Sequence, residues 1–126
     1  MPGVRECDTV GAMSNCLFCR IIAGELPAAK VYEDDQIVAF DDIQPQAPVH
    51  VLIVPRKHIP TLNDLDAADG PLVGRMVQVA TGIARDRGTD TAGYRTLINV
   101  NEGGGQSVYH VHLHLLGGRQ LQYGLG

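Results

Sequence analysis

The 126-residue sequence lacks the features that mark several large classes of protein. No apolar run approaches the roughly 20 residues that a membrane-spanning helix requires, and residues 1–15 have no apolar centre of the kind found in a secretory signal peptide. Three cysteines are present, an odd number that does not suggest a secreted disulfide scaffold. We therefore expect a cytoplasmic protein that does not enter a membrane.

Positive charge is also scarce. Ten Lys and Arg residues stand against 14 Asp and Glu residues, which gives a formal net charge of −4. No cluster of basic residues with interleaved aromatic side chains is present, so nucleic acid is not an expected partner. A small phosphate-bearing ligand held by local backbone dipoles remains compatible with this charge.

The overall composition is that of an ordinary folded domain, with 44% hydrophobic and 19% charged residues. The length suits one domain. Residues 1–13 carry no apolar pattern, and we expect them to form a loose tail ahead of a domain that spans residues 14–126. Met13 is an alternative start of the protein.

Hydrophobic periodicity predicts the order of the helices and strands. The expected elements are a short helix over 16–27, a hairpin over 30–43 around Asp34 and Asp35, a buried central strand over 50–56, the main helix over 70–87, a strand over 94–100, a Gly-rich turn over 103–107 and a last strand over 108–116, followed by coil. Several strands lie close enough in the chain to form hairpins. This order favours an α+β domain with a mostly antiparallel sheet.

Three of the five histidines stand at alternate positions in the last predicted strand, at His110, His112 and His114. Alternate side chains of a strand share a face, so the apolar residues between them would face the core and leave the imidazoles side by side. One metal bound by all three is awkward, because the outer pair would lie ~13 Å apart at the backbone. A merely solvated face would be served equally well by Gln, Thr or Lys, which favours a chemical role.

A Gly-rich stretch, "NVNEGGGQS" (99–107), directly precedes the histidines. Glycine tolerates positive φ, so successive N–H groups could converge on an anion. Histidine can attack phosphorus and carry the transferred group as an N–P adduct, with one ring nitrogen attacking while a neighbouring acceptor holds the proton of the other. His112, flanked by the other two histidines, is the predicted nucleophile.

The pattern His110-Val-His112-Leu-His114-Leu-Leu resembles the signature of the histidine triad (HIT) family. Three separated segments, over 16–59, 93–100 and 105–120, also resemble the nucleoside-phosphoramidase (HINT-like) branch of that family, of bacterial type. The resemblance runs from about residue 14 to the C-terminus, and the order of its segments makes it specific.

The resemblance implies a single HIT-like domain with about five strands, one main helix and one short N-terminal helix, assembled as a homodimer whose sheet continues across the interface. It implies hydrolysis of purine nucleoside phosphoramidates, such as adenosine 5′-phosphoramidate, with His112 transiently nucleotidylated and no cofactor required for catalysis. The other implied positions are His114, Ser107 and the backbone of Gly105 and Gln106 at the phosphate, Asn99 at the phosphate or ribose, Asp42 at the ribose, and Phe18, Ile21, Phe40 and Ile43 around the base. These last four are equally plausible as core residues.

The pair Cys16-x-x-Cys19 has the spacing of metal ligands, but two cysteines do not fill a tetrahedral zinc site. Similar members of the HIT superfamily bind structural zinc through such a pair, a histidine like His50 and the first histidine of the triad, here His110. A redox pair and two buried thiols are the alternatives. Without zinc, His50 and His110 would support His112 instead. His58 is expected to be an ordinary surface or packing residue.

The segment "LLGGRQ" after the triad resembles the phosphoramidase group, whereas the ending "LQYGLG" lacks the Trp typical of eukaryotic relatives and leaves the leaving group open. Three alternatives remain: a hydrolase of dinucleoside polyphosphates or nucleotide–sulfate bonds, a nucleotide-binding regulatory module without turnover, and a metal-dependent hydrolase.

Overall fold

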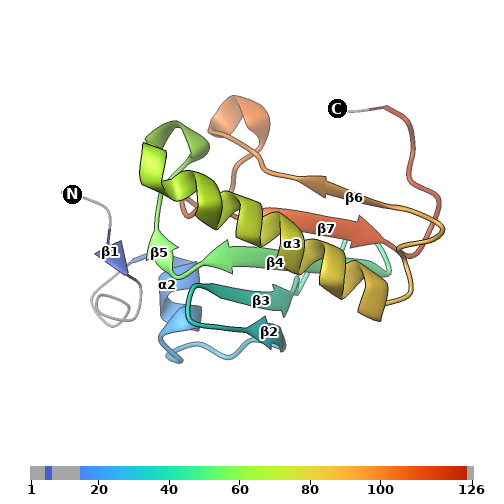
Figure 1. Cartoon of the computed structure of the whole chain (residues 1–126), viewed down its shortest axis with the longest axis horizontal. Helices are drawn as coiled ribbons and strands as arrows, with labels where there is room; N and C mark the ends of the chain where they lie inside the picture. The colour runs from blue at the N-terminus through green and yellow to red at the C-terminus, as the bar shows by residue number, and fades with distance from the viewer. Residues whose placement is uncertain (1–4, 7–14, 125–126) are drawn as a thin grey trace.

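The computed structural model, which describes residues 5–6 and 15–124, contains one large and one small β-sheet (Figure 1). Its helices and strands are β1 (Arg5–Glu6), α2 (Leu17–Ile22), β2 (Lys30–Glu33), β3 (Ile37–Asp41), β4 (Val49–Pro55), β5 (Lys57–His58), α3 (Gly70–Asp86), β6 (Tyr94–Leu97) and β7 (Leu113–Gly117), with 3-10 turns η2 (Leu62–Asp64), η3 (Ala67–Asp69) and η4 (Glu102–Gly104). The large sheet has the order β2-β3-β4-β7-β6, and all its neighbouring strands are antiparallel. The predicted α+β fold, with five antiparallel strands, one main helix and one short N-terminal helix, is confirmed.

Strand β1 forms the small sheet with β5, in the register Arg5 opposite His58. It lies within the stretch expected to be a loose tail. The rest of that stretch, with the alternative start at Met13, falls outside the described residues. Within the described part of the chain, no helix combines the length and apolar character needed to cross a bilayer.

Helix α3 covers one face of the large sheet. Its buried residues recur at helical spacing, so they form one stripe: Met76, Val79, Ala80, Ile83 and Ala84. This stripe packs on the alternate residues of β3 and β4 that point the same way, Ile37, Ala39, Val51 and Ile53. The helix ends at Asp86, within one residue of the predicted boundary, where the Arg87 N–H donates to the Ile83 carbonyl.

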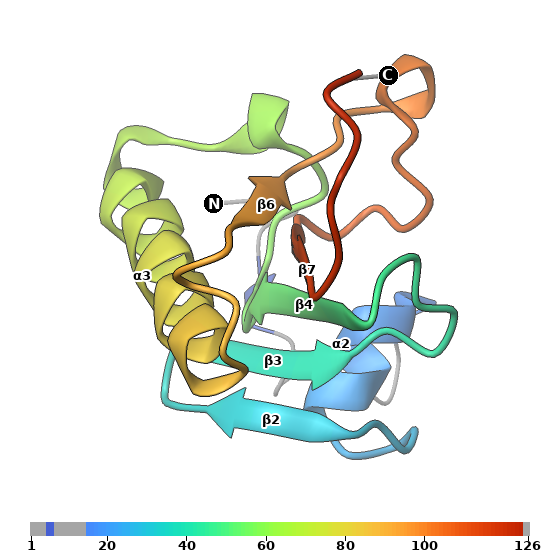
Figure 2. The same cartoon turned by 90° about the vertical axis from the view of Figure 1, so that its right-hand side faces the viewer.

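The short helix α2 covers the opposite face of the sheet (Figure 2). Cys16 caps it, since the Cys16 Sγ accepts the Cys19 N–H at 3.4 Å. The remaining alternate residues of β3 and β4 pack under it: Val38, Phe40, Leu52 and Val54. Both faces of β3 and β4 are therefore buried, which explains why these strands are almost continuously apolar in sequence.

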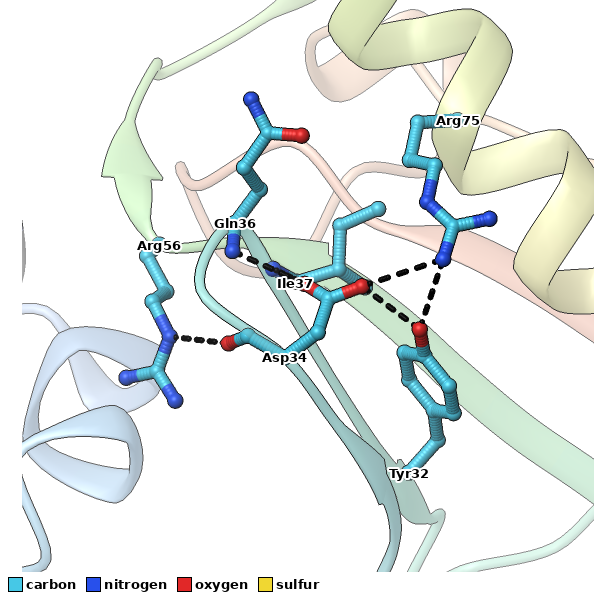
Figure 3. A network of polar contacts seen from close by, with 6 residues as sticks. All are labelled: Tyr32, Asp34, Gln36, Ile37, Arg56 and Arg75. Carbon is cyan, nitrogen blue, oxygen red and sulfur yellow. Dashed lines mark hydrogen bonds and ion pairs between the residues drawn. The ribbon is translucent and has the colours of Figure 1, made fainter.

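The β2–β3 hairpin is tied to the rest of the fold through its turn (Figure 3). The Asp34 carboxylate accepts hydrogen bonds from the Ile37 N–H at 2.8 Å and the Tyr32 hydroxyl at 2.6 Å. Arg75 of α3 donates to the same Tyr32 oxygen at 2.8 Å. Arg56, just after β4, donates to the Asp34 carbonyl at 2.8 Å. The hairpin predicted around Asp34 is confirmed, and these bonds fix its position against the helix and the sheet.

The predicted histidine strand is only partly correct. Strand β7 begins at Leu113, so His114 alone of the three histidines lies in the sheet. Upstream, the Val111 N–H donates to the Ile59 carbonyl at 2.7 Å, outside the main ladder. Strand β6 also ends at Leu97, three residues before the predicted boundary. The segment with His110 and His112 is irregular because its backbone bonds to the connection after β5.

Candidate active site

A cleft of about 610 Å³ opens beside α2. Its walls come from α2, the end of β3, the start of β4 and the chain from Ser107 to His114. The cleft brings together eight of the residues proposed from the sequence: Phe18, Ile21, Phe40, Asp42, Ile43, Ser107, His112 and His114. His50 also lines it.

His112 is held as a neutral imidazole with a defined tautomer. Its Nδ1 lies 2.8 Å from the His110 carbonyl oxygen, so Nδ1–H donates and the lone pair is on Nε2. The side chain is 3% exposed, and the Phe18 ring packs edge-on against it at 5.0 Å. Burial lowers the pKa of His112 below its ordinary value. At neutral pH the Nε2 atom of this residue therefore carries a lone pair of the kind that a histidine nucleophile uses.

His114 receives its orientation from a second chain of hydrogen bonds. The Gln46 backbone N–H donates to His50 Nδ1 at 3.0 Å, so a neutral His50 holds its proton on Nε2. His50 Nε2 lies 2.9 Å from His114 Nδ1 and donates to it. A neutral His114 then carries its own proton on Nε2, a buried atom with no hydrogen-bond partner among the described residues.

Burial keeps both members of this pair neutral. It lowers the pKa of His114 to about 4, with further contributions from His112 and His50. The pKa of His50 is also lowered by burial, which outweighs the opposing effect of the Asp42 carboxylate. Asp42 Oδ2 lies 3.4 Å from His50 Nε2. His114 therefore offers an N–H donor, rather than a positive charge, to a ligand in the cleft.

The Gly-rich turn uses backbone N–H groups of its own to close. The Gly105 N–H donates to the Glu102 carbonyl at 3.0 Å, and the Gln106 N–H donates to the Asn101 carbonyl at 3.0 Å. The glycine run forms a 3-10 turn, with Gly105 at φ +85°. The role of this backbone at the phosphate stays a prediction.

The Gln106 side chain connects the Gly-rich turn to neighbouring backbone segments. It is 7% exposed, and its amide donates to the Pro60 carbonyl at 2.7 Å and the Val108 carbonyl at 3.0 Å. The cleft is left with Ser107, whose hydroxyl and N–H bond to no residue that the structure describes. Asn99 lies beside the turn, with its Nδ2 4.0 Å from where a Cβ on Gly105 would stand, and does not line the cleft.

A second cluster, here called the thiol–imidazole cluster, consists of Cys16, Cys19, His58 and His110. Cys19 Sγ lies 3.3 Å from His58 Nδ1 and 3.6 Å from His110 Nδ1. Cys16 Sγ lies 3.5 Å from His110 Nδ1, and the two Nδ1 atoms are 3.2 Å apart. His110 itself is 0% exposed.

The prediction of His50 as the fourth member of this group is wrong, and His58 takes its place. His50 pairs with Leu116 near one end of β7, far from His110 in the ladder. The other end of β4 reaches His110, whose Nε2 lies 2.7 Å from the Pro55 carbonyl oxygen. His58 follows β4 by three residues and so lies next to His110, whereas His50 lies with Asp42 and His114.

With Cys19 reduced to a thiolate, the thiol–imidazole cluster fits a tetrahedral zinc site. Because His110 Nε2–H donates to Pro55, its Nδ1 lone pair faces the sulfurs, an outer hydrogen bond of the kind that orients histidine ligands. With Zn–N near 2.0 Å and Zn–S near 2.3 Å, tetrahedral angles place two nitrogens ~3.3 Å apart and a nitrogen and a sulfur ~3.5 Å apart. Four of the six separations in the cluster lie between 3.2 and 3.6 Å and match these values.

Together, an α+β domain with a helix on each face of its sheet and a buried neutral histidine beside a cleft define a class of protein with histidines gathered at one ligand-sized site. The HIT domain family matches residues 23–121, and the chain belongs to the histidine triad (HIT) family.

Similar proteins come from several bacteria. The purine nucleoside phosphoramidase of Escherichia coli (strain K12) is 51% identical over 105 residues, which cover 83% of this chain and 88% of that protein. Protein HitA of Neisseria gonorrhoeae is 46% identical over 105 residues, covering 83% and 97%. The crystal structure of a HIT family hydrolase from Legionella pneumophila superimposes with a TM-score of 0.85 at 54% identity, covering 86% of this chain and 97% of that one.

Sequence reasoning missed two contributors to these sites. His58 escaped notice because its position in "PRKHIP" is that of an ordinary loop residue. The Gln46 N–H could not be predicted, because every residue except proline has a backbone N–H and its residue type does not show what that group contacts. Knowledge of the strand register would have identified His58, since the register sets which end of β4 lies next to His110.

Proposed function

We propose that the protein hydrolyses purine nucleoside phosphoramidates, such as adenosine 5′-phosphoramidate, to the nucleoside monophosphate and an amine. It is a hydrolase of the HIT family. The observation that carries the proposal is the bond from His112 Nδ1–H to the His110 carbonyl, which leaves Nε2 of a buried neutral imidazole as the nucleophile beside the cleft.

The reaction has two displacements at phosphorus. In the first, the His112 Nε2 lone pair forms an N–P bond while the bond from phosphorus to the departing nitrogen breaks, and that nitrogen leaves as an amine with a proton from solvent. In the second, water attacks phosphorus, the electron pair returns to Nε2, and a proton goes back to solvent. His114 Nε2–H and the Ser107 hydroxyl are the available donors to the phosphoryl oxygens.

The nucleoside lies along the apolar wall of the cleft. Phe18 and Phe40 pack edge-on at 5.5 Å, and both are 4% exposed, so they belong to the core and to the wall together. Ile43 is 91% exposed at the rim, where a base would cover it. The Asp42 carboxylate, beside His50, is the acceptor for ribose hydroxyls.

The test is AMP release from adenosine 5′-phosphoramidate by the wild type and by His112→Asn and His112→Gly. We expect turnover to fall by ~10⁴-fold or more in both variants, on the order of what loss of an enzymatic nucleophile costs. A trapped adduct should map to His112. Thermal melting confirms that the variants are folded. Turnover that survives in both folded variants contradicts the covalent mechanism.

The same assay separates the alternatives. Faster turnover of dinucleoside polyphosphates or nucleotide–sulfate bonds would assign a different hydrolase activity. AMP binding without turnover on any substrate would assign a regulatory nucleotide-binding module. Activity that a chelator abolishes and zinc restores would assign metal-dependent hydrolysis.

We also propose that the thiol–imidazole cluster holds a structural zinc ion, through Cys16, Cys19, His58 and His110. Bound there, zinc would supply a cross-link between α2, β5 and the segment before β7. Metal analysis of purified protein should find about one zinc per chain, lost in His58→Asn and retained in the matched variant His50→Asn. Zinc lost in His50→Asn and retained in His58→Asn would show that His50, not His58, is a ligand. Absence of zinc from the wild type would reject the proposed zinc site.

The proposed assembly is a homodimer in the cytoplasm, with the large sheet continued across the interface. The edge strands available for this are β2 and β6. Light scattering coupled to size-exclusion chromatography tests the assembly, because a monomeric mass at micromolar concentration contradicts it.

A further inference from the structure

The loop between β3 and β4, residues 42–48, forms part of the cleft wall and is here called the rim loop. It carries Asp42 and Ile43 and also Gln46, whose backbone N–H donates to His50 Nδ1 at 3.0 Å. The rim loop has no regular secondary structure. Its position must therefore be set by contacts with other segments.

The segment directly after β7 supplies these contacts. Gly118 has φ +90°, and a Cβ at this residue would stand 2.9 Å from the Pro48 Cβ, so only glycine lets the chain lie against the rim loop. Arg119 reaches the same loop, because its Nη2 donates to the Gln46 carbonyl at 2.9 Å. Residues of the "GGRQ" segment thus hold the rim loop at Gln46 and at Pro48.

We propose that Arg119 is a positioning residue for the His50–His114 pair: by holding Gln46, it directs the Gln46 N–H at His50 Nδ1 and thereby selects the tautomer of both histidines. Each link is a contact in the structure, from Arg119 to the Gln46 carbonyl, from the Gln46 N–H to His50, and from His50 to His114. The predicted effect of Arg119 on kcat rests on the proposed function, whereas its effect on the histidine tautomers does not.

The consequence of losing this link follows from the hydrogen-bond directions. If Gln46 no longer donates, His50 can move its proton to Nδ1 and accept at Nε2. His114 would then donate its Nδ1–H to His50 and turn an Nε2 lone pair toward the cleft. A lone pair opposes phosphoryl oxygens, whereas the N–H donor stabilises them. The same imidazole would change from a stabilising to an opposing contact.

The experiment is ¹⁵N NMR of the imidazole nitrogens together with kcat, in the wild type, Arg119→Gln and Arg119→Lys. Loss of signals in His50→Asn identifies those of His50. We expect pyridine-type Nδ1 and pyrrole-type Nε2 for His50 in the wild type. In Arg119→Gln the Nδ1 signal should move toward the pyrrole type, and kcat should fall about 10-fold, near the scale of one hydrogen bond to a charged group. Arg119→Lys should retain part of both properties.

Arg95→Gln is the matched control, because Arg95 also donates to a backbone carbonyl, that of Gln122 at 2.6 Å, but does not contact the rim loop. It should leave both readouts unchanged. Unchanged His50 signals in folded Arg119→Gln overturn the inference, whether or not kcat falls. If the wild type does not hydrolyse phosphoramidates, the proposed function fails, and the NMR signals still decide the tautomer.

Discussion

The three histidines of the HIT motif contribute to two different sites, a cluster of potential metal ligands and a cleft for a small molecule. The thiol–imidazole cluster brings four potential ligand atoms within 4.8 Å of one another, and His110 within it is fully buried. The cleft presents His112 and His114 to a ligand-sized space, with tautomers set by backbone groups. His110 joins the two sites, since its ring belongs to the cluster and its carbonyl orients His112.

The comparison shows that the contacts of a histidine side chain, and not its residue type, decide whether it can bind metal or face a substrate. His112 follows His110 by two positions, yet the His110 ring faces two sulfurs and the His112 ring faces the cleft. Because the sites share a backbone segment but no ligand atom, damage to each should be separable by measurement.

Removal of the proposed zinc ion should have the largest effect, and this effect should be on the free energy of unfolding. A structural zinc ion contributes to the free energy of folding, with binding worth on the order of 10 kcal/mol in small zinc domains. This domain also has two apolar cores, so we expect a loss of several kcal/mol without complete unfolding. Urea unfolding with and without a chelator measures it. An unchanged midpoint would show that the cluster does not stabilise the fold.

Replacing His50 should affect the cleft instead. In His50→Asn the bond to His114 Nδ1 is lost, so kcat should fall by about 10- to 100-fold, as expected for a hydrogen bond that supports a charged phosphoryl group. Steady-state kinetics and metal analysis should show low kcat with normal zinc content. His58→Asn is the mirror variant, and equal behaviour of the two would remove the distinction between the sites.

Gly118→Ala tests how firmly the rim loop is held. A positive φ and a Cβ 2.9 Å from the Pro48 Cβ together should lower the free energy of unfolding by about 1–3 kcal/mol. Gly82→Ala in α3 is the control, because a Cβ there meets nothing within 4 Å and should be neutral or stabilising by up to about 1 kcal/mol. Thermal or urea unfolding compares them. Equal stability of both variants contradicts the close approach.

The smallest effect concerns pH. His112 must be neutral to attack, and burial lowers its pKa below the ordinary 6.5, so the protonated form accumulates only at lower pH. The dependence of kcat/KM on pH should therefore show an acid limb whose midpoint lies below pH 6.5. An acid limb above pH 6.5 would show that His112 is not protected from protonation as the structure describes.

Local sequence pattern was sufficient for most of the fold. Helix α3 and the β2–β3 hairpin follow from the spacing of apolar residues and from Asp34, whose side chain caps its own turn. Strand β7 started later than expected because Val111 bonds outside the sheet. An alternating pattern predicts a strand only where a neighbouring strand is present to pair with it.

The candidate site divides in the same way. The histidine pattern indicated His112 as the nucleophile and His114 as its neighbour, and both line the cleft. It did not separate His50 from His58, because His50 lies near the start of β4 and His58 lies three residues after its end. It also did not predict that the Gly-rich segment closes as a 3-10 turn, since glycine content permits a nest and such a turn alike.

Residue order by itself determined the α+β layers, the family and the histidines proposed to carry the chemistry, because these depend on periodicity and on residue type at short spacing. Tertiary structure alone decided that His58 joins the two cysteines and that Gln46 and Arg119 support the cleft histidines. Those contacts join residues that are far apart in the chain, and they depend on strand register and on backbone groups that every residue possesses.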